Sequence, residues 1–301
     1  MSDFRMDEAG LFLERQLEHI RPQVFETVYA DIKYPSILPV TAEAGNAAQT
    51  FTYRIMDSTG DFKLIADAAD DLPRADVSQT EKSIVIRSFG GSFGYTVQEL
   101  RAAQMANIAL EQRRAAAVRR AYEEKVEEVA MFGETAANLA GFFNNSTVDV
   151  LQAVKWVTDS GTTAQEMLEL LEYGVTAMVN ATQMKEQPDT ILMPYEDFRV
   201  ASTRRNSDSS DVTVLEYFLR TNPFINNIEP ILQLDKDKSS LSTNRMVVYK
   251  RDPQKVQLHI PQPLELFPPQ QRGLEFIVPA HARVGGVSLY YPKSVIYIDA
   301  P

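Results

Sequence analysis

The chain has 301 residues, enough for one large domain or two ordinary ones, and 44% of them are hydrophobic and 24% charged, as in an ordinary folded, soluble protein. It contains no cysteine, which excludes disulfides and thiolate metal sites. The N-terminus lacks the features of a signal peptide, and no apolar run approaches the roughly 20 residues of a membrane span, so we expect no export and no membrane partner. The net charge of −11 disfavours strong nucleic-acid binding driven by phosphate neutralisation.

The N-terminal part of the chain predicts a helix, an extended arm and a long β-ribbon. Apolar residues spaced among charges indicate a short amphipathic helix over residues 7–20, and residues 21–44 contain three prolines and are expected to be mostly extended. Residues 50–56 and 83–89 are rich in β-branched and aromatic residues and form the two predicted arms of the ribbon. An isolated hairpin is marginal in water, so the ribbon packs either on its own body or on another copy of the chain.

A long helix is expected after the ribbon. Thr96 and Glu99 have the spacing of a capping box, and neither proline nor glycine interrupts residues 97–132 before Gly133. The regular apolar spacing begins only after Asn107, so we expect a break in the helix near that residue.

The charges of this helix run against its dipole, with basic residues early and acidic residues late. Two interpretations are open. The late glutamates meet cations of another element or subunit, or they form solvated pairs four residues apart, such as Arg119 with Glu123.

The second half of the chain alternates helices and strands, which predicts an α+β body. Helices are expected at residues 163–184, 195–201 and 212–219, with a polar loop at 203–211. Strands are expected at residues 191–194, 228–234, 245–249, 255–260, 274–278, 287–291 and 294–298.

One sequence pattern suggests catalysis. Residues 90–94, Gly-Gly-Ser-Phe-Gly, match the nucleophile elbow of serine hydrolases, with Ser92 as the nucleophile. In an elbow the helix starts directly after the serine, whereas here three residues separate Ser92 from the Thr96 cap. We therefore favour a glycine-rich hinge between a strand and a helix, and expect no catalytic residue.

The residues that could bind metals or cofactors show no recognisable site. The histidines at 19, 259 and 281 lack ligand spacing, and residues 57–61 resemble a calcium loop only faintly. No Walker or dinucleotide motif occurs, so we expect no cofactor and no metal. The acidic segment 67–76 is expected to be solvated or to pair with arginines of a neighbouring copy.

Four phrases of the sequence resemble one family of tailed-bacteriophage major capsid proteins, whose fold is shared with encapsulin shells and the herpesvirus capsid floor. The phrases are residues 68–76 (AADDLPRAD), 94–103 (GYTVQELRAA), 213–219 (TVLEYFL) and 272–287 (RGLEF through HARVGGV). The order of arm, ribbon, capped helix, α+β body and closing strands also resembles that family.

This resemblance implies the tailed-phage capsid fold. The implied parts are an N-terminal arm (1–44), an extended loop (45–95), a peripheral domain with a spine helix (96–154), an axial domain (155–270) and closing strands (271–301). It also implies pentamers and hexamers that tile an icosahedral shell around double-stranded DNA. The expected location is the virion, after assembly in the host cytoplasm, with portal and scaffolding or decoration proteins as further partners.

Two alternative functions stay open: an encapsulin-like compartment shell, and a serine hydrolase built on Ser92. Under the capsid interpretation the functional residues are contacts between subunits. The expected contacts are Asp70, Asp71, Arg74 and Asp76 at the ribbon tip, and Arg119, Arg120, Glu127 and Glu128 on the spine helix.

Overall fold

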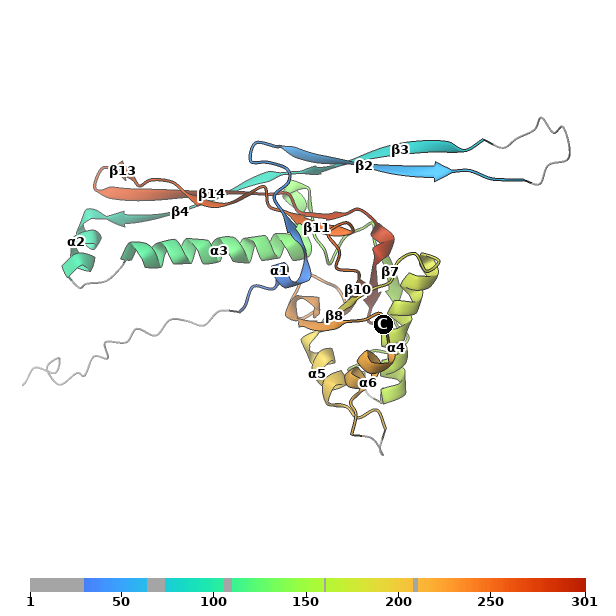
Figure 1. Ribbon diagram of the computed structural model, residues 1–301. Coiled ribbons are helices and arrows are strands. Elements are labelled where there is room, and N and C mark those ends of the chain that lie inside the picture. Colours follow the sequence, from blue (N-terminus) through green and yellow to red (C-terminus); the bar gives the residue numbers. More distant parts are fainter. Residues whose placement is uncertain (1–29, 64–73, 106–109, 160, 208–210) are drawn as a thin grey trace, which may run out of the picture. The chain divides into compact units, whose positions relative to one another are not determined.

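The computed structural model describes residues 30–63, 74–105, 110–159, 161–207 and 211–301 (Figure 1). The chain divides into two units, Met1–Asp31 and Ile32–Pro301, and every element named below belongs to the second. The helix predicted at residues 7–20 lies outside the described residues. Within the described part of the chain, no helix has the length and apolar character needed to cross a membrane.

A five-stranded sheet lies at the centre of the body, with strand order β7-β16-β10-β8-β9. Its strands are β7 (Asp149–Gln152), β8 (Thr190–Pro194), β9 (Asn227–Ile231), β10 (Arg245–Tyr249) and β16 (Val295–Asp299). β10 is antiparallel to both of its neighbours, whereas β7 and β9 pair in parallel with β16 and β8. Every residue of β8 and β16 is buried, which explains why these strands are nearly continuous apolar runs.

Three helices cover one face of this sheet (Figure 1): α4 (Ala164–Ala181), α5 (Tyr195–Thr203) and α6 (Val214–Thr221). The Thr163 side chain caps α4 in a reciprocal capping box, and Thr213 accepts the N–H of Glu216 at the start of α6. α4 ends earlier than predicted because Gln183 and Met184 take positive φ angles of 53° and 62°. The three predicted helices are thus confirmed, with ends that differ from the predicted ones by at most three residues.

The opposite face of the sheet supports a second core. Alternate residues of the strands point to it, including Leu192, Val247 and Tyr297, and Phe142 packs there edge-on against Tyr249 at 5.0 Å between ring centroids. The short helix α1 (Tyr34–Ile37) joins this core, and Tyr249 donates a hydrogen bond of 2.8 Å to the Ile37 carbonyl.

A second sheet is built around β14 (Glu275–Val284), which pairs with β4 (Arg87–Thr96), β12 (Gln262–Leu266) and β13 (Gln270–Arg272). β4 pairs with β14 over its whole length, from Arg87 opposite Val284 to Thr96 opposite Glu275. The prediction of a glycine-rich hinge was therefore wrong. Residues 90–94 lie inside a regular strand and pair with residues 277–281 of β14, far later in the chain.

The ribbon consists of β2 (Thr50–Thr59) and β3 (Asp76–Val85), antiparallel, with Thr50 opposite Val85 and Thr59 opposite Asp76. The predicted bounds of the second arm, residues 83–89, were wrong, since β3 starts seven residues earlier and residues 87–89 belong to β4. The base of the ribbon lies against a small sheet of β1 (Val40–Thr41), β11 (Val256–His259) and β15 (Val287–Leu289).

The long helix is divided into α2 (Val97–Met105) and α3 (Leu110–Phe132). The predicted capping box is confirmed: Thr96 N–H donates to Glu99 Oε2 at 3.0 Å, and Glu99 N–H donates to Thr96 Oγ1 at 3.1 Å. The two helices flank the predicted break, although Asn107 itself lies outside the described residues.

α3 runs beside β4 (Figure 1) and ends at Phe132, directly before Gly133. Gly133 has a φ of 73°, and a Cβ at this position would stand 2.2 Å from the Leu139 carbonyl oxygen, so the helix end requires glycine. The chain then forms a short hairpin of β5 (Gly133–Glu134) and β6 (Leu139–Ala140).

Candidate functional site

The outer half of the ribbon has no cover among the described residues of its own chain. Burial alternates along the first half of β2, where Phe51, Tyr53 and Ile55 are half-buried, and then ceases. Met56 is 70% exposed, Val77 63% and Phe62 99%. Exposed apolar side chains on an unsupported ribbon are typical of a surface that another protein covers.

The polar residues at the outer half of the ribbon are also solvent-facing. Arg74 and Asp76 are exposed, and Asp76 uses Oδ1 to accept the N–H of Val77 at 2.8 Å. Asp70 and Asp71, predicted to lie beside them, fall outside the described residues. Arg54 and Glu81 form a cross-strand ion pair of 2.9 Å on an open face, where such a pair contributes little to stability.

The charged residues of α3 do not form one uniform surface. Arg119 is exposed, whereas Arg120 pairs with Glu124 at 2.7 Å. The pair expected between residues 119 and 123 is not observed, because Glu123 Oε2 accepts the hydroxyl of Tyr34 at 2.8 Å. Glu128 is exposed and pairs with Lys125 at 2.9 Å.

Glu127 is buried against its own chain, with only 8% of its surface exposed. Its Oε1 accepts the backbone N–H of Lys33 at 3.1 Å, and burial raises the pKa of the carboxyl group. Glu123 and Glu127 therefore bind the start of α1 to α3. Glu127 thus contacts another element of the same chain, through a backbone N–H and not through the cation that one of the two interpretations expects.

This difference between neighbouring glutamates gives a direct test. Glu127→Lys is expected to lower the free energy of unfolding by about 2–4 kcal/mol, because it removes the acceptor of Lys33 N–H and places a longer, cationic side chain in a buried position. Glu128→Lys is the matched control and should change the free energy of unfolding by less than about 0.5 kcal/mol. Urea unfolding of both variants measures the difference. Equal losses of unfolding free energy would contradict the finding that Glu127 is buried and Glu128 is exposed.

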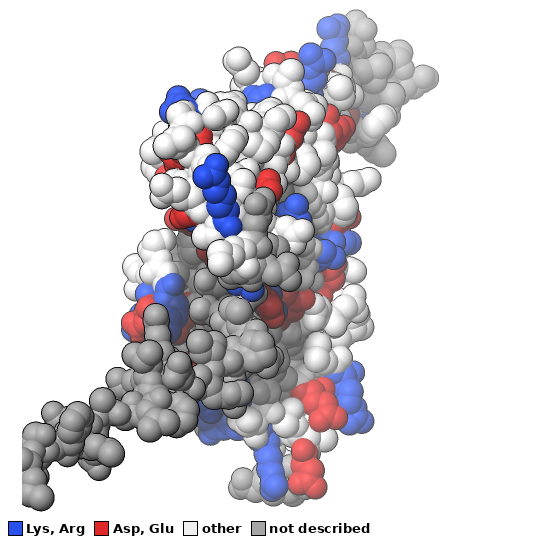
Figure 2. Space-filling view, turned by 90° about the vertical axis from the view of Figure 1, so that its left-hand side faces the viewer, with Lys and Arg blue, Asp and Glu red and all other residues white. Residues whose placement is uncertain are grey.

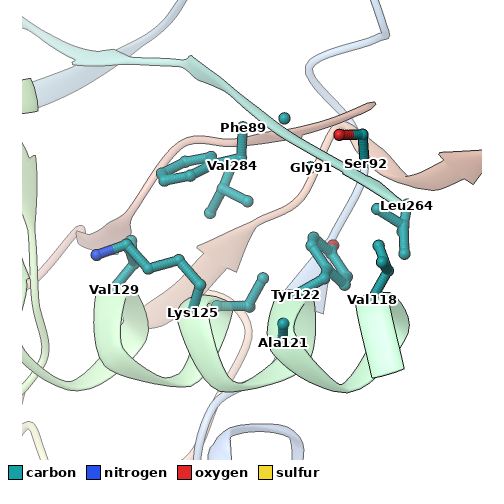
Figure 3. A pocket seen from close by; sticks show the side chains of 12 residues that line it. Phe89, Gly91, Ser92, Val118, Ala121, Tyr122, Lys125, Val129, Leu264 and Val284 are labelled. Atoms are coloured by element: carbon teal, nitrogen blue, oxygen red, sulfur yellow. The ribbon is translucent and has the colours of Figure 1, made fainter. Parts of the chain in front are cut away.

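A cavity of about 240 Å³ lies between α3 and the strands above it (Figure 3). Val118, Tyr122 and Val129 approach it from α3, and Phe89 and Ser92 border it from β4. Burial raises the pKa of Tyr122 to about 12, so its hydroxyl stays protonated at neutral pH. The lining is mainly apolar, and its charged member, Lys125, forms ion pairs with Glu128 at 2.9 Å and with Glu134 at 2.7 Å.

Ser92 does not occupy a nucleophile elbow. It faces Pro279 within the regular pairing of β4 and β14, and among the described residues its hydroxyl has no hydrogen-bond partner. The elbow geometry expected for a hydrolase is thus contradicted by the strand. A hydrolase would also need a histidine next to Ser92. His259 forms its hydrogen bond with Ser288, and His19 lies outside the described residues.

Neither a metal site nor a basic surface emerges from the described ranges. They contain no group of three or more His, Cys, Asp or Glu side chains placed to hold a metal ion. Figure 2 shows basic and acidic side chains interspersed on one face, without a continuous basic area among the coloured residues. This distribution does not favour a sequence-reading nucleic-acid interface.

Comparison with known proteins places this fold among capsid structures. A family model described as "Major capsid protein" matches residues 60–300. The capsid of Myoviridae phage XM1 is similar with a TM-score of 0.86 and 19% identity over 98% of this chain and 100% of that chain. The capsid of an empty GTA particle is similar with a TM-score of 0.68 and 9% identity over 98% of each chain. A virus-like particle from Pyrococcus furiosus is similar with a TM-score of 0.53 and 13% identity over 88% of this chain and 91% of that chain. No curated protein matches the chain.

Proposed function

The chain belongs to the major capsid protein family, and we propose that its copies form the pentamers and hexamers of an icosahedral shell that encloses double-stranded DNA. The uncovered ribbon carries this proposal. A two-stranded ribbon that exposes Met56, Phe62 and Val77 is poorly stabilised alone and is covered when it lies on a second copy.

The contact we propose is heterologous, since the ribbon of one subunit lies on a different surface of the next. A heterologous contact repeated by rotation closes into a ring, and five- and sixfold rings are the units that tile a closed shell. Because each subunit both gives and receives a ribbon, the full apolar surface of the ribbon becomes covered only in the assembled state.

The contact residues follow from exposure. Arg74 and Arg119 are exposed and have no ion-pair partner among the described residues, so each is available to an acidic residue of a neighbour. We propose that they contact the neighbouring subunit together with Asp76, Arg120 and Glu128. Asp70 and Asp71 are proposed to contribute from the ribbon tip, and Glu127 acts by fixing α1 to α3.

A closed shell around DNA has further partners, which are the packaged DNA and the proteins that complete the particle. With a net charge of −11, the subunit encloses DNA without binding it tightly, so the packaged DNA is contacted irrespective of sequence. Assembly takes place in the host cytoplasm, with portal and scaffolding or decoration proteins completing the particle. A structural role of this kind needs no catalytic residue, cofactor or metal ion.

The proposal is tested by negative-stain microscopy and sedimentation velocity of the purified chain across a range of concentrations. Closed particles, or free five- and sixfold rings, are the expected result. A species that stays monomeric at all concentrations, with and without co-expressed scaffolding protein, would refute self-assembly through the ribbon.

A further inference from the structure

The base of the ribbon is held to the body by two aromatic contacts. The Phe51 ring lies 4.5 Å from the imidazole of His259 on β11, measured between centroids, and the two planes are tilted by 36°. Tyr53 packs edge-on against Tyr290 at 4.7 Å, and its hydroxyl donates to the Leu289 carbonyl at 3.4 Å. The first residues of β2 are therefore fixed to the body, whereas its last residues are exposed.

His259 is the unusual member of this contact, because it is a titratable group with no exposed surface. Its Nε2 shares a hydrogen bond with Ser288 Oγ, and its Nδ1 has no partner among the described residues. Phe51 packs on the ring, and Gly285 adjoins the Cβ of His259. The imidazole is thus enclosed by apolar groups and one hydroxyl.

No charged group compensates a proton on this ring. The neighbouring titratable side chains are Tyr53 and Tyr290, whose pKa values are raised by burial, so both remain neutral. Glu43 acts electrostatically on Tyr290, whereas the pKa of His259 is lowered by burial alone. A protonated His259 would therefore be a buried cation without a carboxylate beside it.

We propose that His259 is an acid-sensitive anchor for the ribbon: the neutral ring holds the base of the ribbon on β11 and β15, and the protonated ring releases it. Imidazolium has two N–H donors, and Ser288 accepts one of them while the N–H on Nδ1 finds no acceptor. The attraction of a cation to the Phe51 ring opposes release. It does not replace the missing acceptor, and opening the base of the ribbon gives both donors access to water.

The direction of the pH effect follows from burial. Burial lowers the pKa of His259 to about 4, whereas an exposed histidine titrates near 6.5. The released state therefore takes up the proton first as the pH falls below about 6.5, and the anchor weakens progressively until the pH reaches about 4. Above pH 6.5 both states carry a neutral ring, and the anchor has its full strength.

The test is hydrogen–deuterium exchange of the backbone amides of residues 50–55 and 80–85 in the full-length chain. Wild type is compared with His259→Gln, which can still hydrogen-bond Ser288 but does not titrate. At a given pH the chemical exchange rates of these amides are nearly the same in both proteins. His259→Gln loses the ring contact with Phe51, so its exchange at pH 7.5 serves as the baseline. The ratio of the wild-type exchange rate to the His259→Gln exchange rate should rise by on the order of 30-fold between pH 7.5 and pH 5.

His281→Gln is the control, because His281 lies on β14 away from the ribbon base and should leave the wild-type response unchanged. A ratio that is the same at pH 7.5 and at pH 5 would overturn the proposal. A ratio that falls between pH 7.5 and pH 5 would overturn it too, since the ring then holds the ribbon more tightly as a cation.

If His259→Gln does not fold, the wild-type chain supplies its own reference. Exchange at the ribbon base, corrected for the chemical rates, is then compared with exchange in β10 at each pH. Acceleration confined to the ribbon base supports the anchor, and equal acceleration of both overturns it because it reports global unfolding. All contacts involved lie within one chain, so this outcome is independent of whether the chain forms shells.

Discussion

Replacing residues 57–78 with an Asn-Gly turn is expected to give a folded body that forms no closed shells. Met56 and Gln79 face each other in the register of β2 and β3, so a two-residue turn can join them without shifting the strands. The described residues removed are all exposed, so the free energy of unfolding should change by less than about 1 kcal/mol. Shell formation should be lost, because Phe62, Val77 and the ribbon tip are removed.

Urea unfolding measures the first half of this prediction, and negative-stain microscopy with sedimentation velocity measures the second. The control carries Ser58→Thr and Ser78→Thr in the full-length chain, which keeps the length and backbone pairing of the ribbon and should form shells. Closed shells from the truncated chain would show that the outer ribbon is not needed for assembly. A truncated chain that fails to fold would contradict the prediction that the body folds without the outer half of the ribbon.

The elements with strong local signals could be predicted from the sequence. β10 has the predicted bounds, 245–249, because an apolar run buried on both faces is flanked by polar loops. The capping box at Thr96 and Glu99 depends on two residues three positions apart, and its hydrogen bonds form as expected. In both cases the determining residues are neighbours in the chain.

The strands of the ribbon region were harder to predict because their partners or environments are not local. The first eight residues of β3 are all exposed, so this strand has no apolar period to reveal it. β4 contains three glycines and resembles a hinge until β14, far along the chain, pairs with it. The sequence indicated that a ribbon exists, but tertiary pairing determines where it ends.

In the candidate site, too, contacts between residues far apart in the chain could not be predicted from the sequence. Glu127 and Glu128 are adjacent and chemically identical. Glu127 is buried where it contacts Lys33, 94 residues earlier, and Gln233, 106 residues later, whereas Glu128 is exposed. His259 could be recognised as a lone histidine in a strand without metal-ligand spacing. Its role depends on Phe51, which reaches it through the fold of the ribbon.

A second large effect is expected at Arg245, which joins two neighbouring strands of the central sheet. Arg245 and Asp299 face each other across β10 and β16 and form a two-pronged ion pair, with N–O distances of 2.6 and 2.7 Å. Their side chains are only 14% and 9% exposed. Arg245 also donates to the Phe143 carbonyl at 2.6 Å and lies 4.6 Å from the centroid of the Tyr297 ring.

Arg245→Met should lower the free energy of unfolding by about 3–5 kcal/mol, measured by urea denaturation at pH 7. The stem of the methionine fills part of the space, so the loss comes mainly from leaving the Asp299 carboxylate buried without a cation. The double variant Arg245→Met/Asp299→Leu removes that uncompensated charge and should recover most of the loss. Arg245→Lys should recover little, because a single ammonium cannot bind both carboxylate oxygens and the Phe143 carbonyl together. If the double variant is as unstable as Arg245→Met, the pairing with Phe143 and Tyr297 outweighs the ion pair, and the role assigned to Asp299 is wrong.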